Sequence, residues 1–118
     1  LAAEQVRNDQ TAAALEYLQW TVDQAKLSAQ KDLARLRMAR LMVDQAEYAK
    51  ALELTQQTVS EGFVSLFAEL KGDIYLAQEN KTEAYEAYVE SIASMDADDP
   101  RKTLLEMKRD DVAVINES

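Results

Sequence analysis

Apolar residues recur at intervals of three and four along most of the chain, the spacing that places them on one face of an α-helix. This pattern predicts seven helices, at residues 1–7, 11–28, 31–46, 48–60, 63–79, 82–95 and 101–114. Two glycines and one proline among 118 residues leave few residues that favour tight turns. The sequence therefore predicts an all-α protein whose helices are joined by short connections.

Part of this pattern repeats after 33 residues. The paired positions are Ala39 with Gly72, Met42 with Tyr75, Ala51 with Ala84 and Val59 with Ile92. A small residue followed three positions later by a large one lets the first helix of a hairpin approach its partner closely, and the alanines at 51 and 84 allow the same approach from the second helix. A period of this length is typical of solenoids built from stacked hairpins.

The repeat organises the chain as a single domain, 1–118. We expect a partial first hairpin, a second hairpin, a third hairpin and a terminal helix, at residues 1–28, 31–60, 63–95 and 101–114. Gly62 is expected to end the helix at 48–60 as a left-handed cap. Leu104, Leu105, Met107 and Val112 are expected to face the core. The spacing resembles tetratricopeptide repeats, which implies a right-handed α-solenoid of antiparallel helix hairpins with a C-terminal capping helix.

Composition and charge exclude several classes of function. The chain has no histidine and no cysteine, which removes imidazole chemistry, thiol nucleophiles and the usual zinc and haem ligands. We therefore expect no enzyme, no catalytic residue, no cofactor and no metal site.

The net charge is −9, and residues 61–118 carry 14 acidic against 6 basic residues. Such a field opposes nucleic acid and anionic lipid, which leaves proteins as the expected partners.

A protein-binding face is expected where the first helices of successive hairpins line a concave surface. Its predicted residues are Leu33, Leu36, Arg37, Arg40, Val43, Leu66, Glu69, Leu70, Asp73 and Leu76. Exposed leucines among charges suit an extended or helical protein segment. The alternative is that these leucines belong to the core between repeats and that the charges are solvated.

Two further groups of side chains bear on function. The basic residues at 31, 35, 37 and 40 are expected to pair with Glu69 and Asp73, with a carboxylate of a partner as the alternative. The acidic residues of the second half lack the spacing and the glycine of a calcium loop. Among the aromatic residues, Trp20 lies off the apolar stripe of its helix and is expected to be partly exposed.

Four segments in order resemble the YfgM family of ancillary SecYEG translocon subunits, and the likeness covers nearly the whole chain. The segments are 36–40, 47–52, 69–73 and 106–108. The resemblance implies a chaperone or adaptor domain at the periplasmic face of the bacterial inner membrane. It also implies a single transmembrane anchor that is missing from this chain. The implied partners are the SecYEG translocon, a PpiD-like chaperone and exported client proteins. The alternative is a generic soluble tetratricopeptide scaffold that recruits a fixed peptide ligand.

Overall fold

The protein is all-helical, as the sequence predicts. The computed structural model describes residues 2–57 and 59–117, and these residues contain no strand. The helices are α1 (Ala2–Gln24), α2 (Ser28–Asp44), α3 (Tyr48–Thr55), a short 3-10 helix η1 (Glu61–Phe63), α4 (Val64–Ala77), α5 (Lys81–Ala93) and α6 (Lys102–Glu117). No helix in the described part of the chain is long and apolar enough to cross a membrane.

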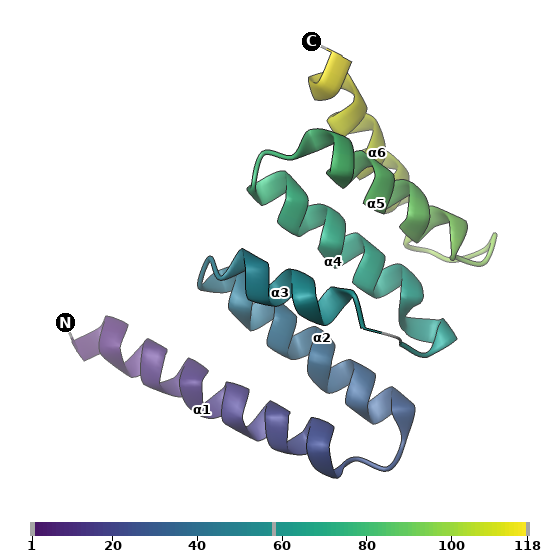
Figure 1. The fold of residues 1–118 in the computed structure, drawn as a ribbon. Coiled ribbons are helices and arrows are strands. Elements are labelled where there is room, and N and C mark those ends of the chain that lie inside the picture. The colour runs from purple at the N-terminus through teal and green to yellow at the C-terminus, as the bar shows by residue number, and fades with distance from the viewer. Residues whose placement is uncertain (1, 58, 118) are drawn as a thin grey trace.

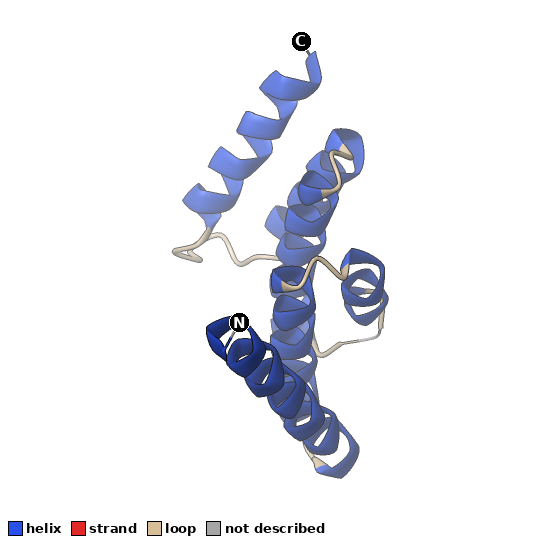
Figure 2. Ribbon diagram, turned by 90° about the vertical axis from the view of Figure 1, so that its left-hand side faces the viewer, coloured by secondary structure: helices blue, strands red, loops and turns tan. Residues whose placement is uncertain are grey.

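The helices stack in chain order, with the two termini at opposite ends of the molecule (Figure 1). Each helix contacts the next one, and α2 also contacts α4 across the junction between hairpins. Seen from the side, α3 and α6 lie on opposite sides of the stack (Figure 2). The result is a flat body of 42 × 38 × 22 Å.

Small residues lie at the closest helix contacts, at the positions that the repeat predicts. Ala39, Ala51 and Ala84 are each 0% exposed. A Cβ atom built on Gly72 would lie 2.5 Å from Cε1 of Tyr88, which is far closer than such atoms approach one another. The predicted approach between α4 and α5 is therefore confirmed.

The turns inside the two hairpins repeat as well. Ala46 has a φ of 60° and Glu79 a φ of 64°, so left-handed residues occur 33 positions apart. In both turns the following backbone N–H donates a hydrogen bond of 2.8 Å to the carbonyl oxygen five residues earlier, as in a Schellman motif. The predicted left-handed cap at Gly62 is wrong, because this glycine lies in η1 and has no positive φ.

The predicted break between helices 1–7 and 11–28 does not occur in the described residues, where α1 runs without interruption from Ala2 to Gln24. Residues 8–10 contain neither glycine nor proline, and the Thr11 hydroxyl donates a hydrogen bond of 2.9 Å to the Arg7 carbonyl within the helix. In place of the two helices predicted at 1–7 and 11–28, the described residues form the single helix Ala2–Gln24, which pairs with α2.

The helix predicted at 48–60 is also too long, since α3 ends at Thr55. A buried carboxylate holds part of the connection that follows. Asp32, 2% exposed, accepts a hydrogen bond of 2.7 Å from the backbone N–H of Ser60 and another of 3.2 Å from Arg35. Because Asp32 of α2 binds Ser60, a loop takes the place of the last turn of the helix expected at 48–60.

As far as Ala113, the last residue of α6 whose side chain the structure describes, this helix packs through one face. Leu105 and Val112 are 0% and 1% exposed and contact the α5 cluster around Tyr88, as predicted. Leu104 and Met107 are 50% and 59% exposed, so their predicted core positions are wrong. On a helix, the side chains of Leu104 and Met107 lie about 100° and about 160° around the axis from Leu105, so they point away from α5.

Candidate protein-binding surface

A hollow of about 360 Å³ opens between α1 and α2 near the turn that joins them. The two helices are held together by Leu18 of α1 against Ala34 and Met38 of α2, all less than a tenth exposed. Beside this small core, the exposed side chains of Tyr17, Trp20 and Leu33 leave apolar surface uncovered. The lining residues are Tyr17, Leu18, Trp20, Thr21, Gln24, Ala25, Gln30, Leu33, Ala34 and Arg37.

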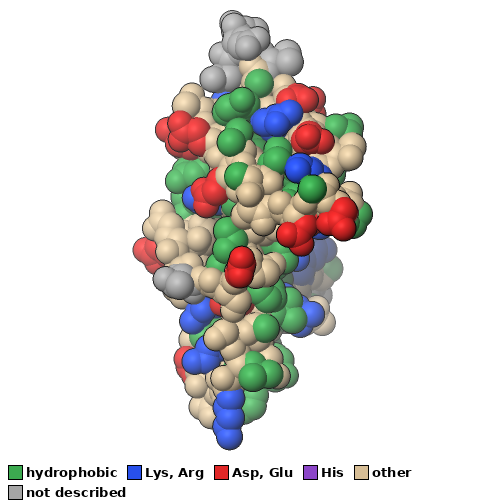
Figure 3. Space-filling view, turned by 90° about the vertical axis from the view of Figure 1, so that its right-hand side faces the viewer, with side chains coloured by type: hydrophobic (Ala, Val, Ile, Leu, Met, Phe, Trp, Pro, Cys, Tyr) green, Lys and Arg blue, Asp and Glu red, His purple; other side chains and the backbone are tan. Residues whose placement is uncertain are grey.

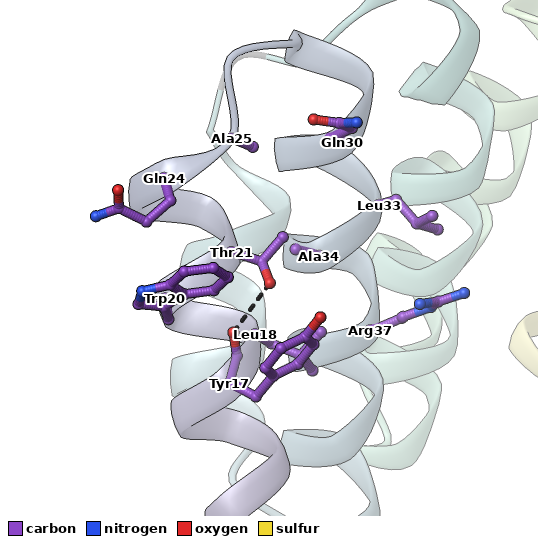
Figure 4. Close-up of a pocket in the computed structure, with 10 residues that line it drawn as sticks. All are labelled: Tyr17, Leu18, Trp20, Thr21, Gln24, Ala25, Gln30, Leu33, Ala34 and Arg37. Carbon is purple, nitrogen blue, oxygen red and sulfur yellow. Dashed lines mark hydrogen bonds between the residues drawn. The ribbon is translucent and has the colours of Figure 1, made fainter.

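Two aromatic side chains form the α1 side of the hollow. Tyr17 and Trp20 are 65% and 58% exposed, and their rings stack with centroids 6.0 Å apart at 25°. The Thr21 hydroxyl donates a hydrogen bond of 3.0 Å to the Tyr17 carbonyl (Figure 4). The predicted exposure of Trp20 is confirmed, whereas the contribution of Tyr17 was not predicted.

The α2 side of the hollow combines an aliphatic and a basic side chain. Leu33 and Arg37 lie across the hollow from Trp20, with the Tyr17 ring between them (Figure 4). Arg37 is exposed and forms no ion pair with another described residue. Two of the ten predicted binding residues therefore lie together beside an open apolar surface.

The other predicted residues of α2 divide between core and solvent. Leu36 is 2% exposed and belongs to the central core cluster, so its place on a binding face is wrong. Val43 is partly buried against the same cluster, and Arg40 is exposed. Leu36 is buried because α3 and α4 both pack on that side of α2.

On α4, Leu70 is 6% exposed and is likewise a core residue instead of a surface residue. Leu66 packs partly against the same core, while Leu76 is 38% exposed near the end of the helix. The apolar positions predicted on α4 thus offer little surface to a partner.

Glu69 and Asp73 of α4 are engaged by α6 and the loop before it, and not by the arginines of α2 as expected. Arg101 donates to Glu69 at 2.6 Å, and Lys108 contacts Glu69 at 2.8 Å and Asp73 at 3.1 Å. Asp73 also accepts a hydrogen bond of 2.6 Å from the Tyr88 hydroxyl. The sequence did not reveal this cluster, because its hydrogen-bonded pairs are 15 to 39 residues apart in the chain.

These contacts shift the ionisation of the groups involved. Burial acts to raise the pKa of Glu69, but the hydrogen bonds and charges of Lys108 and Arg101 outweigh it and hold this pKa below its ordinary value. Burial acts to lower the pKa of Lys108, but Glu69 and Asp73 outweigh it and raise that pKa. Burial raises the pKa of Tyr88, and its bond to Asp73 raises it further. Glu69 and Lys108 therefore keep their charges at neutral pH, and their ion pair holds α6 against α4.

Charge is unevenly distributed over the surface. Acidic side chains gather over the half of the molecule that contains the C-terminus (Figure 3). Residues 1–60 carry 8 acidic and 7 basic residues, so the half with the hollow is nearly neutral. The described residues contain no group of three or more side chains suited to a metal ion. Chemically, the hollow can bury an apolar side chain and pair Arg37 with an acid.

Comparisons with known proteins agree with this architecture. The model of a family described as tetratricopeptide repeat-like domain matches residues 1–114. The ancillary SecYEG translocon subunit of Neisseria gonorrhoeae is 34% identical over 94 residues, which cover 80% of this chain and 45% of that protein. The chain thus spans less than half the length of this relative. No solved structure matches the chain.

Proposed function

The chain belongs to the tetratricopeptide repeat-like domain family, and we propose that it serves as the protein-binding domain of an ancillary SecYEG translocon subunit. The resemblance to the YfgM family is confirmed by the similarity to the Neisseria gonorrhoeae protein. The domain is a non-catalytic protein-interaction module, so its contribution is to hold other proteins.

The observation that carries the proposal is the open hollow between α1 and α2. It exposes two aromatic rings and Leu33 next to Arg37, which has no ion-pair partner among the described residues. Aromatic and arginine side chains are enriched at the energetically important centres of protein interfaces. A surface of this kind suits a protein segment with an apolar anchor and a nearby acid.

The finer features of the proposal come from the translocon relative and the family resemblance. We propose that the domain lies at the periplasmic face of the inner membrane, held by a single anchor outside this chain. There it acts as a chaperone or adaptor, and its partners are SecYEG, a PpiD-like chaperone and exported clients. The competing proposal is a scaffold for one fixed peptide, which would show a single ligand and no translocon component.

The test is capture of translocon components from detergent extracts of the native membrane. Reversing two charges beside the hollow, Arg37→Glu with Arg40→Glu, should lower capture by about tenfold, because an acidic partner segment is then repelled. A control with the same change in net charge, Lys50→Glu with Lys102→Glu, should capture as well as the unaltered domain. Circular dichroism checks that both variants remain helical.

Equal recovery by the two double variants would contradict the assignment of the binding surface. Absence of translocon components from every sample, with one other protein recovered instead, would favour the fixed-ligand scaffold.

A further inference from the structure

Helix α6 is joined to its two neighbours by different kinds of contact. It packs closely on α5, where Leu105 and Val112 lie against the cluster around Tyr88. These two are the buried side chains of α6 as far as Ala113. Within the described residues the backbones of α6 and α4 do not pack closely, and long charged side chains connect the two helices instead.

The ion pairs with α4 lie at the start of α6 and in its second turn. Arg101 and Lys108 reach the Glu69 carboxylate at 2.6 and 2.8 Å, and Lys108 also reaches Asp73 at 3.1 Å. Glu69 and Asp73 are four residues apart on α4, where two like charges repel each other. The cations brought by α6 therefore offset a repulsion that exists on α4 without them.

The connection that precedes α6 has the features of a hinge. Residues 96–100 lie outside any helix, and all of them except Asp99 are exposed. The hydrogen bonds that the structure describes for this connection stay within residues 96–102. A hollow of about 420 Å³ lies between the connection and the start of α4, and a loop carries the chain away from the stack to α6 (Figure 2). The connection can therefore rearrange without disturbing the buried core.

We propose that α6 is a hinged cover, which opens from the α4–α5 hairpin as one unit about residues 96–100 while the rest of the stack stays folded. Proteins open locally in contiguous units where few apolar contacts hold an element in place. The two buried side chains of α6 and its ion pairs are the contacts that opening breaks.

Opening uncovers the ring of Tyr88, which lies beside the carboxylates of Glu69 and Asp73. Access to this face of the hairpin then depends on the ion pairs of Glu69. The inference is independent of the hollow between α1 and α2, and it goes beyond the proposed function.

Hydrogen exchange of backbone amides in the whole chain, followed by nuclear magnetic resonance, tests the proposal. If α6 opens as one unit, the amides of residues 105–112 share one opening equilibrium and exchange faster than the most protected amides of α4. Low concentrations of urea should accelerate these amides together, because opening of the unit exposes surface. Fraying from the end of the helix would instead give a gradient of rates along α6 with little dependence on urea.

Two conservative variants separate opening of α6 from unfolding of the stack. Glu69→Gln removes the shared negative charge and should accelerate exchange at residues 105–112 by about tenfold. Ile74→Val weakens the central core cluster and not the cluster beneath α6. It should accelerate the most protected amides of α2 and α4 by about fivefold and leave those of α6 unchanged. The control Glu86→Gln, at an exposed position of α5, should change neither rate.

Four results would overturn the proposal. Exchange at residues 105–112 as slow as in the core of α4, or equal acceleration of both by Ile74→Val, would show that α6 separates only when the stack unfolds. A gradient of rates without urea dependence would show fraying. Unchanged exchange of α6 in Glu69→Gln would show that the ion pairs do not hold the cover. Circular dichroism checks that each variant is folded.

Discussion

Gly72 lies at a very close contact between α4 and α5. The nearby ring of Tyr88 cannot move aside easily, because the side chain is 1% exposed and its hydroxyl is bound to Asp73 at 2.6 Å. Glycine is used here for its lack of a side chain, since its backbone has no positive φ. A single atom added at this position therefore tests how closely the hairpin is packed.

We expect Gly72→Ala to lower the free energy of unfolding by about 1–3 kcal/mol through overpacking against Tyr88. Helix propensity alone would give the opposite sign, with alanine more stable by about 0.5–1 kcal/mol. The matched control is Gly62→Ala, because a Cβ on Gly62 meets nothing within 4 Å. Urea unfolding of both variants measures the effect, and a Gly72→Ala protein that is more stable than the original would show that the contact is loose.

At the scale of whole elements, α6 depends on charges that lie far from it in sequence. Arg101 and Lys108 both contact Glu69, whose side chain is 13% exposed. Removing the Glu69 carboxylate takes this ion-pair partner away from Arg101 and Lys108, which are both partly buried. A partly buried charge that loses its partner lowers the free energy of unfolding by about 1–3 kcal/mol.

The contribution of Glu69 should depend on pH. Its pKa is lower in the folded protein than in the unfolded chain, so its stabilisation is complete at neutral pH and is lost as the pH falls through the folded pKa. Glu69→Gln should therefore be less stable than the original protein by about 1–3 kcal/mol at pH 7. The difference should shrink as the pH falls below about 4.

Urea unfolding of both proteins across this pH range measures the effect. Glu86→Gln on the exposed face of α5 is the control and should change stability by no more than about 0.5 kcal/mol at either pH. A Glu69→Gln deficit that is the same at pH 7 and pH 3 would contradict the role of the ionised carboxylate.

The helices that the sequence predicted well are those marked by residues within the helices themselves. The repeat of small residues located α4 and α5 within a few residues, because Gly72 packs against Tyr88 of α5 and Ala84 is fully buried in the same hairpin. The break predicted at residues 8–10 did not rest on a residue that breaks helices, and it was wrong. The end of α3 was missed because Asp32, which fixes the loop, is 28 residues away from Ser60.

For the candidate site, the sequence identified a helix face but not which of its residues are exposed. Leu33 and Leu36 both fit a stripe on α2, yet the first is 39% exposed and the second 2%. The difference comes from α4, which contacts the side of α2 that carries Leu36. Burial of this kind depends on how hairpins stack, which helical periodicity alone does not specify.

On the scale of the whole molecule, the proposed binding surface is separated from the excess of acidic residues. The open apolar surface lies at the end of the stack formed by α1 and α2. The C-terminal half of the chain carries most of the negative charge. In that half, Glu69 and Asp73, which were predicted to bind a partner, pair with Lys108 of α6 instead. Partner contacts are therefore expected at the N-terminal end of the stack, away from α5.

Site-specific photocrosslinking in the full-length protein, in its native membrane, tests this placement most directly. A photoreactive residue at Leu33, beside the hollow, should capture defined translocon-associated proteins, and the same residue at Glu86, on the exposed face of α5, should capture them in far lower yield. Equal capture from both positions, or capture from Glu86 alone, would contradict a binding surface between α1 and α2.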